Sequence, residues 1–266
     1  MDNRFFRNYG PRAMVIGGSQ GIGRAFALAC AARGLDVIIT GRRPAPLEDV
    51  RKEIEAGSGV SCSVIVCDMT EEGAAEQLEE RTKGLEIGLV IYNAADTWVG
   101  PFLEEPFEHC GRIINVNCRG VLEIMHRFGK RFTEKGRGGF ILMSSMSGLQ
   151  GTPLVAAYAA TKAFIRVLGE SLWEEFLPFG VDVLTCIAGA IRTPNYLATK
   201  PEESGALVPE MAPETVAEKA LAGLGRKPSL IPGVLNNLAG FLMGRLLSRK
   251  AAVRFIAGNM HRQYRM

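Results

Sequence analysis

Arg12-Ala-Met-Val-Ile-Gly-Gly-Ser-Gln-Gly-Ile-Gly23 is the stretch of this sequence that decides the fold. A largely apolar run of strand length leads into a loop rich in glycine, and a helical pattern follows from Ala25 to Ala32. In such a turn, backbone N–H groups at the helix N-terminus meet a pyrophosphate, and glycines avoid the collision that a Cβ would cause. A plain strand–helix turn is the alternative. We predict a dinucleotide site formed by Gly17, Ser19, Gln20, Gly21, Ile22 and Gly23.

A second apolar run, from Leu35 to Thr40, is followed by Gly41-Arg42-Arg43, which indicates the kind of dinucleotide. A site for NAD places a carboxylate near the end of this strand to bind the ribose hydroxyls. Arginine instead matches a phosphate through charged, often bidentate hydrogen bonds. We therefore predict NADP as the cofactor, with NADPH preferred over NADH and with Arg42 and Arg43 at its phosphate. The alternative is that both arginines merely face solvent.

Apolar segments of strand length alternate with helical patterns along almost the whole chain. This alternation predicts an α/β protein with a single-domain Rossmann fold, in which helices flank a doubly wound parallel sheet of about seven strands. No linker, repeat or low-complexity block divides residues 1–266. The other strands are expected at about 62–67, 87–92, 139–145, 181–187 and 229–231, and the other helices at about 47–56, 71–83, 105–135, 156–179 and 213–223.

The overall composition excludes several classes of function. Of the 266 residues, 47% are hydrophobic and 22% charged, and a formal net charge of +3 is too small to indicate nucleic-acid binding. The six cysteines and three histidines lack metal-ligand spacing, so no metal site is expected. Scattered cysteines are typical of a reducing compartment, and residues 1–12 do not resemble a signal peptide, so we expect a cytoplasmic protein.

Tyr158-Ala-Ala-Thr-Lys162 places a phenol and an ammonium about one helical turn apart, on one face. A free tyrosine has a pKa of about 10, and a cation within about 4 to 6 Å lowers such a pKa by roughly one to three units. We therefore expect Lys162 to make Tyr158 more acidic and fit for general acid–base catalysis. A solvated helix face would show the same spacing, which is the alternative.

The apolar run Gly139-Phe-Ile-Leu-Met-Ser-Ser145 ends thirteen residues before Tyr158 in two hydroxyls. It predicts a buried strand that delivers Ser145 at its carboxyl end, the edge where open α/β sheets bind their ligands. The alternative is a serine that caps the next turn, and we expect this role for Ser144 or Ser147.

Ser145, Tyr158 and Lys162, in this order and spacing, resemble the active site of the short-chain dehydrogenase/reductase family. The spacing of Gly17, Gly21 and Gly23 is similar to the family's Thr-Gly-x-x-x-Gly-x-Gly, with an Ile in place of the Thr. The resemblance extends over roughly residues 10–229. The sequence from residue 9 to residue 12, Tyr-Gly-Pro-Arg, is weakly similar to the branch that contains 17β-hydroxysteroid dehydrogenases and long-chain 3-oxoacyl reductases.

The resemblance implies further cofactor-binding residues. Asp68, with Met69 beside it, would contact the adenine, although Asp68 could instead cap the helix before Glu71. Two other segments match family motifs with one departure each, Ala95 in place of a glycine and Ala188 in place of a proline. The residues implied by these segments are Asn93, Ala94, Ala95, Gly189, Ile191 and Thr193.

Asn117 is a polar residue in the apolar stretch of the helix expected at 105–135. A buried amide needs partners. In the family, an asparagine of this helix holds a water in a proton relay to the lysine, and Asn115-Val-Asn117-x-x-Gly120 is similar to that motif. The alternative is a satisfied core amide, and Asn115 is a second candidate for the relay.

The resemblance implies an NADP(H)-dependent oxidoreductase that interconverts a ketone and a secondary alcohol. Tyr158 would exchange the proton, Ser145 would stabilise the oxygen charge, and Lys162 would bind the nicotinamide ribose. A non-catalytic NADP-binding sensor or regulator on the same fold is the alternative. A sensor, however, has no need for both Tyr158 and Lys162.

Two segments near the C-terminus are expected to concern the substrate. Residues 194–213 lack periodicity and predict a lid over a hydrophobic substrate such as a steroid, a long-chain oxoacyl compound or an aromatic ketone. The tail, about 232–266, is apolar and then basic, and Pro232 and Gly240 interrupt it. We expect it to be a pocket wall or an oligomer contact, with a basic amphipathic helix on a membrane surface as the alternative. The family resemblance also implies a homodimer or homotetramer.

Overall fold

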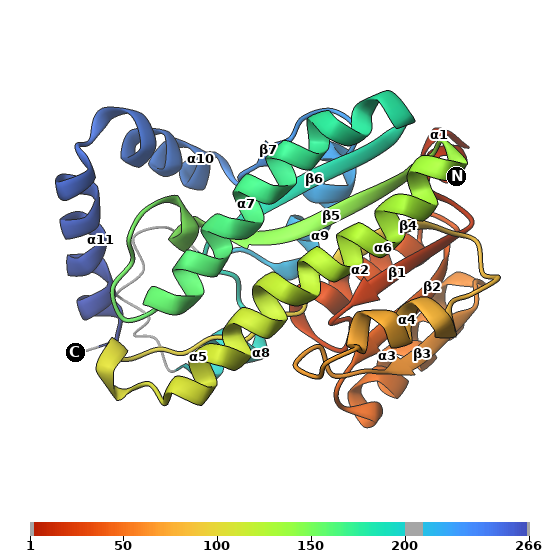
Figure 1. Cartoon of the computed structure of the whole chain (residues 1–266), viewed down its shortest axis with the longest axis horizontal. Coiled ribbons are helices and arrows are strands. Elements are labelled where there is room, and N and C mark those ends of the chain that lie inside the picture. Colours follow the sequence, from red (N-terminus) through yellow and green to blue (C-terminus); the bar gives the residue numbers. More distant parts are fainter. Residues whose placement is uncertain (1–2, 200–209, 265–266) are drawn as a thin grey trace.

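The computed structural model describes residues 3–199 and 210–264 of the chain. Within those residues, seven parallel strands form one sheet in the order β3-β2-β1-β4-β5-β6-β7 (Figure 1). The chain starts in the middle of the sheet and winds outward in both directions, which confirms the predicted doubly wound α/β fold. The strands are β1 (Arg12–Ile16), β2 (Asp36–Gly41), β3 (Cys62–Val66), β4 (Ile87–Tyr92), β5 (Gly138–Ser145), β6 (Val181–Ala188) and β7 (Ser229–Leu230).

Helices cover both faces of the sheet, because successive strand residues point to opposite sides. Ala13 and Val15 of β1 pack into one core with α1 (Asn3–Tyr9), α2 (Gly21–Ala31), α3 (Pro44–Ser58) and α9 (Pro213–Gly223). The alternate residues Met14 and Ile16 pack into a second core with α4 (Ala74–Arg81), α6 (Gly120–Lys135) and α7 (Ala156–Phe176). The sheet is therefore buried on both faces, and its carboxyl-end edge is left for a site.

The prediction of one uninterrupted α-helix at 105–135 is wrong, because a π turn divides this helix. It consists of α5 (Phe107–Ile114), a π turn (Asn115–Arg119) and α6. The phenol of Tyr92 donates a hydrogen bond to the carbonyl oxygen of Val116 at 2.6 Å, inside the π turn. A Cβ on Gly120 would lie 2.5 Å from the same phenol oxygen, so the helix approaches β4 very closely here. Such π turns occur frequently at functional sites.

Other boundaries differ by a few residues from those expected. The helix expected at 71–83 starts later because Gly73 precedes it with a φ of +78°. The helix expected at 47–56 is longer, since Pro44 fits the first turn and Gly59, with a φ of +68°, ends it. Helix α7 ends at Phe176, and a 3₁₀ turn, Leu177–Phe179, continues it.

The C-terminal part of the chain covers the carboxyl-end edge of the sheet (Figure 1). It contains α8 (Pro194–Ala198), α10 (Val234–Phe241), a π turn (Leu242–Leu246) and α11 (Arg249–Tyr264). Half of the lid expected at 194–213, namely residues 200–209, lies outside the described residues. Among the helices that the structure does describe, none has the length and apolar character needed to cross a bilayer.

Candidate active site

A cavity of about 870 Å³ lies at the carboxyl ends of the strands. It brings together almost all the site residues predicted from the sequence; Gly23 and Asn117 are not among its lining residues. The predicted residues that line it are Gly17, Ser19, Gln20, Gly21, Ile22, Arg42, Arg43, Asp68, Met69, Asn93, Ala94, Ala95, Ser145, Tyr158, Lys162, Gly189, Ile191 and Thr193.

Three glycines of the loop between β1 and α2 stand where a side chain would collide with its neighbours. Gly17 has a φ of +84°, and a Cβ there would lie 2.8 Å from the backbone nitrogen of Ala94. A Cβ on Gly21, whose φ is +54°, would lie 2.9 Å from Cγ2 of Thr193. A Cβ on Gly23 would lie 1.9 Å from the carbonyl oxygen of Gly17, so Gly23 serves packing within the loop. The loop and the N-terminus of α2 thus form a cradle that fits a pyrophosphate.

The glycine loop is tied to β4 although Ile16 replaces the family's threonine. The backbone nitrogens of Asn93 and Ala94 donate to the carbonyl oxygen of Ile16 at 2.9 and 2.8 Å. The side-chain amide of Asn93 donates to the carbonyl oxygen of Gly17 at 2.9 Å. Backbone and amide bonds therefore supply the connection that the missing hydroxyl would make.

The two arginines after β2 are exposed at the rim of the cavity. Nη2 of Arg43 donates to Oε1 of Gln20 at 2.9 Å, and Nε2 of Gln20 donates to Oδ1 of Asn195 at 2.7 Å. This chain of bonds connects the end of β2 through the glycine loop to α8. The rim therefore presents guanidinium groups, which fit the extra phosphate of NADP.

Asp68 lines the cavity two residues after the end of β3. Its Oδ1 accepts a hydrogen bond from the backbone nitrogen of Thr70 at 3.0 Å, which stabilises a local turn. The N-cap of α4 is Gly73, so the alternative in which Asp68 caps this helix is wrong.

Ser145 ends β5 with its side chain at the cavity. Its Oγ accepts hydrogen bonds from the backbone nitrogen of Ser147 at 3.2 Å and from the Ser147 hydroxyl at 3.0 Å. Ser145 itself is therefore the capping serine, not Ser144 or Ser147 as expected; the hydroxyl of Ser144 donates to the carbonyl oxygen of Lys162 at 2.7 Å. Because Ser145 Oγ accepts both bonds, its hydroxyl can still donate a hydrogen bond to an oxygen in the cavity.

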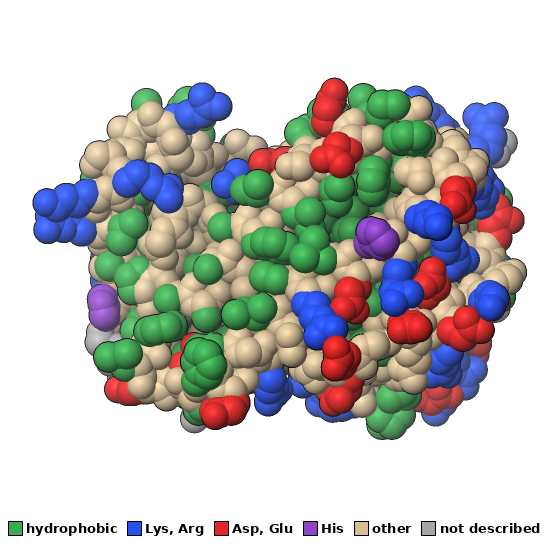
Figure 2. Space-filling model, in the orientation of Figure 1, with side chains coloured by type: hydrophobic (Ala, Val, Ile, Leu, Met, Phe, Trp, Pro, Cys, Tyr) green, Lys and Arg blue, Asp and Glu red, His purple; other side chains and the backbone are tan. Residues whose placement is uncertain are grey.

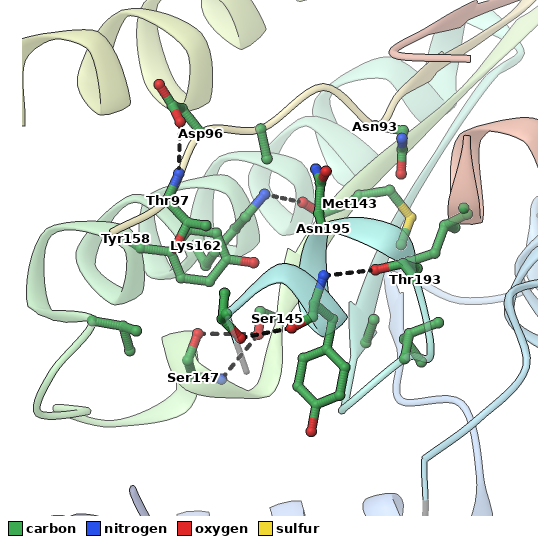
Figure 3. Close-up of a pocket in the computed structure, with 18 of the residues that line it drawn as sticks. Asn93, Asp96, Thr97, Met143, Ser145, Ser147, Tyr158, Lys162, Thr193 and Asn195 are labelled. Carbon is green, nitrogen blue, oxygen red and sulfur yellow. Dashed lines mark hydrogen bonds between the residues drawn. The ribbon is translucent and has the colours of Figure 1, made fainter. Parts of the chain in front are cut away.

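Tyr158 and Lys162 project from the first turns of α7 into the same cavity as Ser145 (Figure 3). Lys162 is only 2% exposed, and its Nζ donates to the carbonyl oxygen of Met143 at 2.9 Å. Nζ also lies 5.4 Å from the centre of the Tyr158 ring. Serine, phenol and ammonium thus converge from two neighbouring elements, β5 and α7.

The pKa of Tyr158 is shifted upward, whereas the sequence led us to expect a downward shift. Burial raises it to about 12, while a hydrogen bond with Ser145 lowers it and the nearby Tyr264 raises it further. Burial lowers the pKa of Lys162 to about 8. Burial is therefore the largest influence on this pKa, the expected lowering by Lys162 is not found, and the phenol keeps its proton at neutral pH.

Asn117 is fully buried in the π turn, and its side chain is held by protein groups. Its Oδ1 accepts from the backbone nitrogen of Asp96 at 2.9 Å. Its Nδ2 donates to the carbonyl oxygen of Asp96 at 2.9 Å and to Oγ1 of Thr161 at 3.0 Å. The alternative of a satisfied core amide therefore fits the side chain better than a water relay. The amide ties the loop after β4 to α7, one residue before Lys162.

The tail supplies cavity residues that the sequence did not indicate individually. Nε2 of Gln263 donates to the phenol oxygen of Tyr196 at 3.0 Å, which joins the end of α11 to α8. The expected pocket wall is thus present, although the helical pattern could not show which side of each helix faces the cavity. The tail residues that line the cavity are Asn236, Ala239, Met243, Ile256, Asn259, Met260, Gln263 and Tyr264.

Among the described residues, no group of three or more His, Cys, Asp or Glu side chains could hold a metal ion. The groups that the site presents are a phenol, a hydroxyl and an ammonium beside the dinucleotide cradle.

Comparisons of the sequence with known proteins agree with this geometry. The short chain dehydrogenase family model matches residues 11–204. The chain is 35% identical over 232 residues to a 7beta-hydroxysteroid dehydrogenase of Clostridium sardiniense, a match that covers 87% of this chain and 89% of that protein. It is 30% identical over 248 residues to a very-long-chain 3-oxoacyl-CoA reductase-like protein of Arabidopsis thaliana, covering 90% and 78% of the two chains.

Solved structures agree as well. A structure from work on 7beta-hydroxysteroid dehydrogenase stereoselectivity has a TM-score of 0.89 at 30% identity, covering 95% of this chain and 98% of that one. A short-chain dehydrogenase from Sphingobium yanoikuyae in complex with NADPH has a TM-score of 0.79 at 25% identity, covering 90% and 97%. The predicted family and the weaker similarity to its steroid and oxoacyl branch are therefore confirmed. This chain belongs to the short-chain dehydrogenase family of oxidoreductases.

Proposed function

We propose that this protein is an NADP(H)-dependent oxidoreductase that interconverts a hydrophobic ketone and its secondary alcohol. The observation that carries the proposal is the convergence of Ser145, Tyr158 and Lys162 in one cavity with the glycine cradle. Among the substrates expected from the sequence, a steroid ketone is favoured over a long-chain oxoacyl compound and over an aromatic ketone. The 35% identity to a 7beta-hydroxysteroid dehydrogenase supports this order.

The protein's groups are suited to moving a proton at the substrate oxygen. When bound, the dinucleotide would supply or accept the hydride at the substrate carbon. Tyr158, with a pKa of about 12, is protonated at neutral pH and would donate to the oxygen as a ketone is reduced. Ser145 would donate a hydrogen bond to the same oxygen and stabilise the charge that develops there. In alcohol oxidation the phenol would accept the proton in return.

Lys162 would hold the nicotinamide ribose and provide the positive charge next to the phenol. Its buried ammonium is fixed by the carbonyl oxygen of Met143, so its position at the cavity wall is defined before any ligand binds. Asn117 would act through position, because its bonds to Asp96 and Thr161 hold α7 against the loop after β4.

The preference for NADPH would come from Arg42 and Arg43. The segment after β2 offers two guanidiniums and no carboxylate at residues 41–43, where NAD would need an acceptor for its ribose hydroxyls. The similarity to a structure that contains NADPH is in keeping with this assignment.

The cavity wall next to the phenol contains several apolar side chains. Ile256 and Met260 of α11 and Val155 of the loop before α7 line the cavity and pack around Tyr158. An apolar wall next to the reacting oxygen favours a large hydrophobic substrate over a sugar or another small polar alcohol.

The test is the absorbance of the nicotinamide during incubation of the protein with ketosteroids, 3-oxoacyl thioesters and aromatic ketones, each with NADPH or NADH. We expect turnover with NADPH, fastest with a ketosteroid. Binding of NADPH without absorbance change for any compound would favour the non-catalytic sensor and overturn the proposal. Turnover that is as fast with NADH as with NADPH, or faster, would overturn only the assignment of Arg42 and Arg43 to the phosphate of NADP.

A homodimer or homotetramer and a cytoplasmic location complete the proposal. Side chains of Ile114, Leu122 and Val167 are exposed around α6 and α7, and Figure 2 shows hydrophobic atoms gathered across this face. Such a face supports subunit contact. The six cysteines are all free, which is typical of a reducing compartment.

A further inference from the structure

Helix α10 carries its large apolar residues on the side that faces solvent. Val234 is 85% exposed, and Leu235, Leu238 and Phe241 are each more than half exposed. Their spacing places them on one helix face. The opposite side carries Asn236 and, in the π turn that follows the helix, Met243; both are buried and line the cavity. The large apolar residues of α10 are therefore left at the surface, where a surface helix usually carries polar ones.

The exposed apolar residues continue beyond α10. Leu242 and Leu246 follow in the π turn, and Leu247 comes directly after it. We call these seven residues the apolar face: Val234, Leu235, Leu238, Phe241, Leu242, Leu246 and Leu247. A group of exposed apolar residues of this size marks a surface that contacts a protein or a membrane.

The charges around the apolar face have one sign. From Lys219 to the C-terminus the sequence has nine of the chain's 31 Lys and Arg residues and none of its 28 Asp and Glu residues. Arg245, Lys250 and Arg254 are exposed, and within residues 3–199 and 210–264 none of them forms an ion pair. In Figure 2 the lobe at upper left, where Figure 1 places α10 and the start of α11, shows Lys and Arg atoms beside hydrophobic ones, without Asp or Glu atoms.

We propose that the apolar face rests on the surface of a bilayer that contains anionic lipids. The leucines and Phe241 would enter the boundary between headgroups and acyl chains, and the cations would lie at the lipid phosphates. Apolar side chains flanked by Lys and Arg are the combination that binds such surfaces. The helix lies in the surface and does not span it.

The same charges disfavour a second copy of this chain as the partner. In a two-fold contact the same patch of each subunit meets its equivalent, so the unpaired arginines around Leu246 would face those of the other copy. No carboxylate in this part of the sequence could pair with them. An anionic lipid surface satisfies the cations, whereas a self-contact leaves them repelling each other.

The test is sedimentation of the full-length protein with vesicles, either of phosphatidylcholine alone or of phosphatidylcholine mixed with an equal amount of phosphatidylglycerol. We expect binding to the mixed vesicles that weakens as salt is raised, and little binding to phosphatidylcholine alone. Arg245→Ala with Arg254→Ala should lower the partition coefficient by about tenfold or more, since each cation near an anionic surface matters. Leu238→Glu with Phe241→Glu should abolish binding.

Two control substitutions lie outside the apolar face and the cations around it. Leu103→Glu replaces an apolar residue that is 92% exposed, and Lys83→Ala removes an exposed cation; both should leave vesicle binding unchanged. Equal binding of wild type and the arginine double variant, or no binding of the wild type to mixed vesicles, would overturn the proposal. The proposal would also be overturned if the wild type did not bind vesicles and Leu238→Glu with Phe241→Glu dissociated an oligomer. The apolar face would then be a subunit contact. If that variant fails to fold, the arginine variant decides the outcome alone.

Discussion

The Nζ atom of Lys162 lies 5.4 Å from the centre of the Tyr158 ring, and its hydrogen bond goes to the carbonyl oxygen of Met143 at 2.9 Å. The ammonium is thus held beside the phenol by the backbone of β5. Its burial lowers the pKa of Lys162 to about 8, which means that the folded protein disfavours the charge. Burying this lysine lowers the stability of the fold, so its position is explained by its role in the site.

Lys162→Met is expected to stabilise the cofactor-free protein at pH 7 by roughly 1–3 kcal/mol while abolishing turnover. Below about pH 8 the lysine is charged in both folded and unfolded states, so the cost of burying the charge is fully present. Between about pH 8 and 10.5 the folded state loses the proton and the unfolded chain keeps it, so wild-type stability rises relative to the variant. Urea unfolding at several pH values measures this difference. A gap that stays constant up to pH 10.5 would contradict the assigned pKa.

Asn117→Ala is expected to lower the free energy of unfolding by about 2–4 kcal/mol. The change leaves the backbone groups of Asp96 without their buried amide partner and releases Thr161. Asn115→Ala, in the same π turn, is the control and should cost about 1 kcal/mol or less. Urea unfolding of both variants provides the comparison, and similar costs for the two would remove the special role of Asn117.

Arg43→Ala is expected to raise the KM for NADPH about tenfold to a hundredfold, because a charged hydrogen bond to a phosphate is lost. The KM for NADH should change little, since NADH has no phosphate at that place. Lys52→Ala, which removes an exposed cation on α3, should change neither constant. Steady-state kinetics with both cofactors test this, and an equal loss for NADH and NADPH would show that Arg43 does not discriminate between them.

Gln263→Ala and Tyr196→Phe each remove the bond that joins α11 to α8. Each should raise the substrate KM by about fivefold, the effect of losing about 1 kcal/mol, and leave NADPH affinity unchanged. The double variant should be no worse than either single one, because both act on the same bond. Additive effects of the two substitutions would indicate separate roles.

The sequence predicted the sheet and most of the cavity because local patterns determine them. The glycine loop from Gly17 to Gly23, the apolar strands and the serine at the end of β5 each depend on neighbours in the chain. These signals give the order of elements, and the parallel α/β arrangement then brings their carboxyl ends together. Ser145, Tyr158 and Lys162 were placed in the same cavity by this reasoning, and the structure agrees.

Features that depend on long-range packing could not be predicted. The π turn at Asn117 depends on the approach of Tyr92 from β4, and the direction of the Lys162 ammonium depends on the Met143 carbonyl. The raised pKa of Tyr158 follows from burial under α11, a helix that contacts it from a distant part of the sequence. The exposure of the large apolar residues of α10 is also visible only once its cavity side is known.

The most direct test of the account is the substitution Tyr158→Phe, which removes one hydroxyl and keeps the ring. Turnover of a ketosteroid with NADPH should fall about 10²–10⁴-fold, the contribution of a positioned proton donor. The dissociation constant of NADPH, measured by fluorescence titration, should stay within about threefold of wild type, a change of well under 1 kcal/mol. Turnover that remains near the wild-type rate would contradict the assignment of Tyr158 as the proton donor.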